Sequence, residues 1–173
     1  MHKYDIFETE NHLQPAFDAN VFNSLHRWKF GWEVLSVINV AKDKVHEIEL
    51  AKRFSPGQKA LYFIWYLDAQ VTNGGFIQFY WNGYRQYIYP IAAGLKFIGD
   101  TETYDILLKA DKEYILHKEE FAFQHDRDDW KPLYKNLINF KEYDSAYYRQ
   151  HDNMMDLIEK YARQNPGDFV KLY

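Results

Sequence analysis

Apolar residues recur at helical spacing along most of the chain, and short polar segments interrupt them. Over Val21–Val40, one face is apolar, with Phe30, Val34, Val37, Ile38 and Ala41. A short helix over Val45–Lys52 follows. Ser55-Pro56-Gly57-Gln58 then predicts a helix start, because Ser caps helices, Pro suits the first position and Gln closes a capping box. Ala60, Leu61, Ile64, Trp65, Leu67 and Val71 behind it predict the central core helix.

Further helices are predicted between polar or glycine-containing breaks. Pro90 should bend its helix or lie in its first turn, Gly99 should end that helix, and Asp100 or Thr101 should cap the next. A polar turn is expected over His125–Asp129, and Asn165-Pro166-Gly167 should end the last long helix. The predicted segments are Phe76–Trp81, Tyr84–Ile98, Glu102–Ala122, Asp129–Phe140 and Ser145–Gln164.

Residues 1–20 are polar and contain Pro15, which predicts a mostly extended N-terminal arm. No window shows sustained two-residue alternation between turn signals. We therefore predict an all-α fold, a single-domain bundle of about seven helices over residues 21–173.

Composition excludes some kinds of site. The chain has no cysteine, so disulfides, thiolate nucleophiles and cysteine-ligated metals are excluded. A secretory signal and an uncharged apolar stretch of membrane-spanning length are both lacking, so we expect a cytoplasmic protein without a membrane partner. The net charge is −4. Residues 1–99 hold 10 basic and 9 acidic residues, whereas residues 100–173 hold 11 basic and 16 acidic residues, so the acidity lies in the C-terminal part. A basic footprint for direct nucleic-acid binding is missing.

Catalytic chemistry finds little support. The serines do not lie in nucleophile-elbow turns, and no cofactor is implied. His117 with Glu113 and Glu120 has helical spacing suited to metal ligands, but one incomplete set is a weak signal. A metal-dependent enzyme is the least favoured alternative.

The acidic residues offer a stronger candidate. Asp152, Asp156 and Glu159 form a helical row, but Lys160 and Arg163 lie four positions after two of them and favour a self-paired surface. The candidate partner-binding set has fewer intervening cations and contains Glu119, Glu120, Asp126, Asp128 and Asp129. Asp128 or Asp129 could equally cap the next helix.

A more specific signal is the segment Tyr66–Asn82, a helix running into Asn-Gly-Gly-Phe and then Gln, aromatic residues and Asn. With weaker elements at Ala93–Gly99 and Tyr143–Tyr148, it resembles a bacterial family of the DNA-mimic-protein type. We interpret the block as structural: glycines allow a change of direction, Asn caps the next helix, the aromatics pack on the core and the amides bond the turn's backbone. Its residues are Asn73, Gly74, Gly75, Phe76, Gln78 and Asn82.

The resemblance implies a helical fold, often dimeric, and one member of that family is a decoy that occupies a transcription factor's DNA-binding face. We therefore expect a non-catalytic, homodimeric module that binds a protein partner, with an acidic DNA mimic, whose carboxylates are placed like DNA phosphates, as the first hypothesis. The modest net charge leaves an alternative open, a general interaction or immunity-type protein that binds through an aromatic surface.

Overall fold

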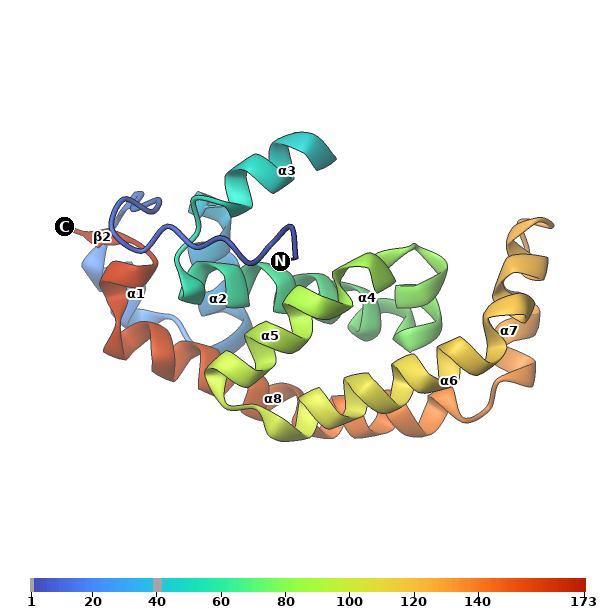
Figure 1. Ribbon diagram of the computed structural model, residues 1–173. Coiled ribbons are helices and arrows are strands. Elements are labelled where there is room, and N and C mark those ends of the chain that lie inside the picture. Colours follow the sequence, from blue (N-terminus) through green and yellow to red (C-terminus); the bar gives the residue numbers. More distant parts are fainter. Residues whose placement is uncertain (1, 39–41) are drawn as a thin grey trace.

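The computed structural model describes residues 2–38 and 42–173, and this part of the chain is almost entirely helical (Figure 1). The predicted all-α class is confirmed. The helices are α1 (Ala19–Ser24), α2 (Arg27–Ile38), α3 (Lys44–Ala51), α4 (Pro56–Trp81), α5 (Ile88–Ile98), α6 (Thr101–His125), α7 (Lys131–Asn136) and α8 (Phe140–Gln164). The 3-10 turns η1 (Tyr84–Tyr87) and η2 (Pro166–Asp168) and the strands β1 (Ala16–Phe17) and β2 (Lys171–Leu172) complete the described elements.

The long helices α6 and α8 lie side by side along the lower edge of Figure 1, with α4 and α5 packed above them. Helix α4 is the central core helix that the sequence predicts, since Phe63, Ile64, Leu67 and Val71 are all fully buried. None of the helices described is both long and apolar enough to cross a membrane.

The N-terminal arm is extended, as predicted, but it packs against the bundle. Tyr4 and Phe17 are buried, and β1 pairs in parallel with β2, so that the last part of the arm lies beside the C-terminal residues Lys171 and Leu172. Asp18 then caps α1 by accepting hydrogen bonds from the N–H groups of Asn20 (2.7 Å) and Val21 (3.1 Å).

The prediction of one helix over Val21–Val40 is wrong within the described residues, which form α1 and α2. Leu25 leaves the helical conformation, and Arg27 has a φ of 50°. The break lets Arg27 and His26 turn toward α8, where they meet acidic side chains. Val40 and Ala41 lie outside the described residues.

Several predicted helix boundaries are confirmed. Ser55 Oγ accepts a hydrogen bond from the Gln58 N–H and Gln58 Oε1 accepts one from the Ser55 N–H, each at 3.0 Å, which completes the capping box. Pro90 lies in the first turn of α5, and Gly99 ends that helix with a φ of 80°. Asp100 caps α6 by accepting from the Thr103 N–H at 3.0 Å.

The boundaries between α6 and α8 differ from prediction. Helix α6 continues to His125, α7 ends at Asn136 instead of Phe140, and α8 begins at Phe140 instead of Ser145. Phe140 is fully buried, with its ring centroid 5.9 Å from that of Tyr80. This tertiary packing, which local sequence does not encode, places Phe140 at the start of α8.

Candidate functional site

Helix α4 changes direction at the glycine pair that the sequence singled out. Gly74 has φ −154° and ψ 24°, and Gly75 has φ 73° and ψ −176°. The second combination is essentially restricted to glycine. The chain then resumes a helix through the buried rings of Phe76 and Phe79, so the block shapes α4 as the sequence predicts.

The helical segment after the kink is capped from another helix. The Phe76 N–H donates to Asp144 Oδ1 of α8 at 2.8 Å, whereas Asn73, the predicted cap, donates from its side-chain amide to Gln78 Oε1 at 2.9 Å. Asn73 still lies in the helical part of α4, so its side chain cannot serve as the cap after Gly75. Burial raises the pKa of Asp144, and the hydrogen bond from Phe76 opposes this shift.

The amides of the block bond to one another rather than to the backbone, contrary to prediction. Gln78 Nε2 and Asn82 Nδ2 both donate to Gln70 Oε1, at 3.2 and 2.8 Å. With the bond from Asn73 to Gln78, four carboxamides form a chain across the kink.

These amides open onto a groove of about 520 Å³, here called the amide groove. Its walls hold three aromatic rings, and no charged side chain lines it. The lining residues are Asn73, Gly74, Ile77, Gln78, Trp81, Asn82, Trp130 and Tyr134. The volume falls within the range of roughly 300–1,000 Å³ usual for ligand sites.

Two contacts fix the groove's walls. The Tyr134 hydroxyl of α7 donates to the Gly74 carbonyl, and burial raises the Tyr134 pKa. At the end of α6, the His125 ring stacks on Trp81 with centroids 4.0 Å apart and planes inclined by 13°, and its Nε2 lies 2.8 Å from the Trp81 carbonyl. The groove is therefore assembled from α4, α6 and α7.

The predicted acidic residues lie beside this groove. Asp126, Asp128 and Asp129, here called the acidic turn, connect His125 to Trp130 at the right-hand end of Figure 1. Asp126 and Asp128 are exposed, and Asp129 Oδ1 accepts from the Lys131 N–H at 3.1 Å, so it does help to start α7. No side-chain ion pair involves the acidic turn within the described residues.

Glu119 and Glu120 lie upstream on α6, and both are exposed. Glu120 Oε1 is 2.9 Å from His117 Nδ1, whose other nitrogen lies 3.3 Å from Glu113 Oε1. These are the residues of the metal alternative. The His117 ring contacts both carboxylates, and in residues 2–38 and 42–173 no group of three His, Cys, Asp or Glu side chains is placed to hold a metal ion.

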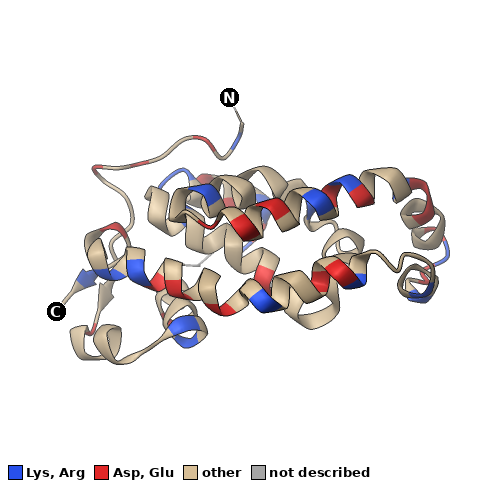
Figure 2. Cartoon of the chain, turned by 90° about the horizontal axis from the view of Figure 1, so that it is seen from below, with Lys and Arg blue, Asp and Glu red and all other residues tan. Residues whose placement is uncertain are grey.

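The acidic row on α8 is paired with basic side chains, mainly from outside its own helix. Arg27 lies 2.6 Å from Asp152 and 2.8 Å from Asp156, where the sequence pointed to Lys160. Glu159 pairs with Arg163 at 2.8 Å, as predicted from their spacing. Figure 2 shows acidic and basic residues interspersed along α6 and α8.

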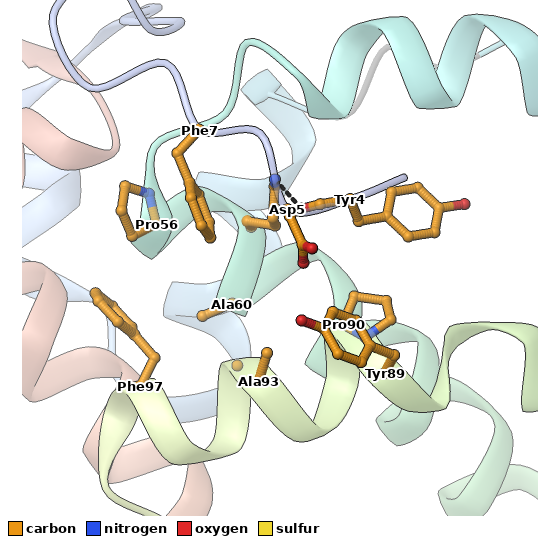
Figure 3. Close-up of a pocket in the computed structure, with 11 residues that line it drawn as sticks. Tyr4, Asp5, Phe7, Pro56, Ala60, Tyr89, Pro90, Ala93 and Phe97 are labelled. Atoms are coloured by element: carbon orange, nitrogen blue, oxygen red, sulfur yellow. Dashed lines mark hydrogen bonds between the residues drawn. The ribbon is translucent and has the colours of Figure 1, made fainter. Parts of the chain in front are cut away.

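A second cavity lies under the N-terminal arm. Figure 3 shows Phe7, Pro56 and Phe97 at one end and Tyr89 and Pro90 at the other. Its volume of about 110 Å³ is too small for an ordinary ligand site. Lys59 also lines it and donates to the carbonyls of Tyr4 and Ile6, and burial lowers the Lys59 pKa to about 8. The hydrogen bonds from Lys59 therefore hold the arm on the bundle.

Sequence reasoning missed the groove because its parts are distant in the chain. Trp130 and Tyr134 carried no local signal for a shared site, and Gln70 and Asp144 stood out only as members of two separate segments that resemble the family. Only the position of Trp130 directly after the acidic turn could have connected the two candidate sets.

Comparison with known proteins agrees with the resemblance noted in the sequence. The profile of the family described as "DMP19-like protein" matches residues 52–165. A relative named "DNA mimic protein DMP19", from Neisseria meningitidis serogroup B (strain ATCC BAA-335 / MC58), is 32% identical over 121 residues, which cover 68% of this chain and 73% of the relative. The kink, the amide groove and the acidic turn all lie within residues 52–165, which the family profile matches. The chain belongs to the DMP19-like protein family.

Proposed function

We propose that this protein is a non-catalytic DNA mimic that occupies the DNA-binding face of a DNA-binding protein. The observation that carries the proposal is the acidic turn, whose carboxylates are free of ion pairs in the described structure and lie at one end of the helical bundle. The name of the relative, a DNA mimic protein, supports the same interpretation. A DNA-binding partner implies residence in the cytoplasm.

The surface beside the turn has the make-up of a protein interface. Leu116 and Phe123 of α6 are 77% and 51% exposed. They share a helix face with Glu119 and Glu120, which lie between them at spacings of three and four residues. Exposed apolar side chains beside carboxylates suit a partner that combines basic residues with an apolar contact.

The charge distribution limits how much DNA is imitated. Carboxylates three or four positions apart on a helix have Cβ atoms roughly 5–6 Å apart, which is close to phosphate spacing. The acidic row on α8 is paired with Arg27 and Arg163 and cannot contribute fully. We therefore expect a short footprint at the end formed by α6 and the acidic turn.

The test is capture of partners from a lysate of the source organism, using the tagged chain at low salt followed by a high-salt wash. Exposed charges are screened over about 8–10 Å at moderate ionic strength, so a partner held by the acidic turn should be released. A captured DNA-binding protein that is released by salt, and that DNA displaces, would support the proposal.

The decisive variant is Asp126→Asn, Asp128→Asn and Asp129→Asn together. Asn can keep the hydrogen bond to Lys131 and tolerates the φ of 51° at Asp128, so the fold should persist. The matched control is Glu102→Gln, Asp105→Asn and Glu142→Gln, which removes three exposed charges elsewhere. Equal partner binding by both triple variants would rule out the acidic turn as the binding surface.

An aromatic surface supports the second candidate, a general interaction protein. Trp28 and Trp32 of α2 are 46% and 47% exposed, and their rings stack with centroids 5.7 Å apart. We assign the proposed homodimer contact to this pair, which is remote in sequence from the acidic turn. Trp28→Ala should then convert a dimer to a monomer, as measured by light scattering. If a different protein binds the wild-type chain at high salt and no longer binds the Trp28→Ala variant, the second candidate would be favoured.

A further inference from the structure

We propose that the amide groove binds an arginine side chain presented by the partner. This inference rests on the proposed function, because it assumes a basic partner at the acidic turn. It adds a specific pocket to what would otherwise be a diffuse attraction between charges.

The groove offers aromatic surfaces suited to a guanidinium group. The Trp81 ring is held in place by His125 stacked on it at 4.0 Å. Trp130 is 47% exposed, and its ring meets that of Tyr134 edge to face at 5.3 Å. A planar guanidinium group stacks favourably on such rings, with Trp the strongest acceptor.

Within the part of the chain that the structure describes, the amide chain leaves two side-chain oxygens without a hydrogen-bond donor, on the exposed residues Asn73 and Asn82. Asn73 and Asn82 each donate from Nδ2 within the chain of carboxamides, and neither Oδ1 accepts a hydrogen bond in the described structure. Arginine carries five N–H donors in a rigid fork and no acceptor, so it complements two such oxygens. Lysine has a compact, strongly hydrated charge and cannot match this geometry as well.

The charges next to the groove favour a cation. Asp126, Asp128 and Asp129 outnumber Arg127 and Lys131 in the connection to α7. Arg127 is also turned back on α6, with its guanidinium group 3.5 Å from the centre of the Phe123 ring and a hydrogen bond to the Phe123 carbonyl. An anionic ligand would meet these carboxylates, whereas an arginine would be attracted by them.

The experiment follows the indole N–H signals of Trp81 and Trp130 by NMR in the ¹⁵N-labelled chain. The probe is N-acetyl-arginine methylamide, compared with the citrulline and lysine analogues. Citrulline keeps the planar shape without the charge, and lysine keeps the charge without the fork. We expect saturable shifts with arginine, and binding about tenfold weaker for both analogues, the size of one lost charge-assisted hydrogen bond.

Asn82→Ala should weaken arginine binding several-fold, while Asn153→Ala, an exposed asparagine on α8, should leave it unchanged. Unshifted Trp28 and Trp32 signals would show that the fold is intact. Equal binding of citrulline, no saturable shift, or shifts at Trp28 and Trp32 instead would overturn the inference.

Salt-sensitive capture of a DNA-binding protein without arginine binding would leave the proposed function standing and remove only this pocket. Arginine binding without any DNA-binding partner would support the pocket and remove the proposed function.

Discussion

Asp144 of α8 accepts a hydrogen bond at 2.8 Å from the backbone N–H of Phe76, 68 positions earlier in the chain. The bond caps the second half of α4 immediately after its kink. It also explains the glycine at position 75, where an added Cβ would lie 2.4 Å from Asp144 Oδ2. One inter-helical contact therefore fixes the angle at which α4 presents the amide groove.

Gly75→Ala should be strongly destabilising. The residue has a φ of 73° with an extended ψ, and a Cβ would collide with Asp144. We expect a loss of at least about 3 kcal/mol in the free energy of unfolding, measured by urea denaturation. Gly83→Ala is the control, because Gly83 has a φ of 75° but open space around it, and should cost only about 1–2 kcal/mol. Similar losses in both variants would contradict the predicted collision.

Replacement of Asp144 separates the hydrogen bond from the charge. Because burial raises the Asp144 pKa, its ionised form is penalised, and Asp144→Asn should cost less than about 1 kcal/mol while keeping an acceptor for Phe76. Asp144→Ala should cost roughly 1–2 kcal/mol, as expected for a lost helix cap. Chemical denaturation measures the free energy of unfolding of the two variants. A larger loss of stability for Asp144→Asn than for Asp144→Ala would refute the capping role.

Glu47 holds α3 on the bundle through four tyrosines. Its carboxylate accepts from the hydroxyls of Tyr62 and Tyr87 at 2.9 Å, from Tyr4 at 3.3 Å and from Tyr66, and it is only 4% exposed. Glu47→Gln removes one acceptor oxygen and the charge, so we expect a loss of about 2–3 kcal/mol by thermal or urea unfolding. The exposed Glu49 pairs with Lys52, and Glu49→Gln should change stability by less than about 0.5 kcal/mol.

His151 should make stability depend on pH. Its hydrogen bond to the buried Asp68, with Nε2 to Oδ1 at 3.0 Å, raises the His151 pKa above the ordinary 6.5, although burial opposes the shift. A histidine with a raised folded pKa stabilises fully below the unfolded pKa and loses that contribution as pH rises through the folded pKa. The stability difference between wild type and His151→Gln should therefore shrink from pH 6 to pH 9 in urea titrations. A constant difference would show that the His151 charge is not stabilising.

Arg27→Gln should have little effect on stability despite short ion pairs. The Arg27 side chain is 49% exposed, and its partners Asp152 and Asp156 are 65% and 52% exposed. Solvent-exposed pairs contribute about 0–1 kcal/mol, so the loss should stay within about 1 kcal/mol in urea unfolding at moderate salt. The substitution would free two carboxylates on α8. If carboxylates alone determine partner affinity, binding at low salt should increase.

The sequence alone determined the helical class, the core of α4 and several helix starts and stops, because these depend on residues close together in the chain. The capping box at Ser55, the stop at Gly99 and the cap at Asp100 are local hydrogen-bond patterns, and the structure has all three. The kink at Gly74-Gly75 is likewise explained by glycine's access to positive φ.

The tertiary structure alone decided what these elements bring together. Phe140 begins α8 because its ring is buried against Tyr80, and Asp144 rather than Asn73 caps the segment after the kink because α8 passes there. Arg27 of another helix pairs with Asp152 and Asp156 in the acidic row on α8. Trp130 and Tyr134 close a groove whose amides come from α4 and the residue after it. Helical periodicity fixes which side of a helix is apolar, but contacts between helices depend on packing over the whole chain. The charge and shape of the candidate site arise from those contacts.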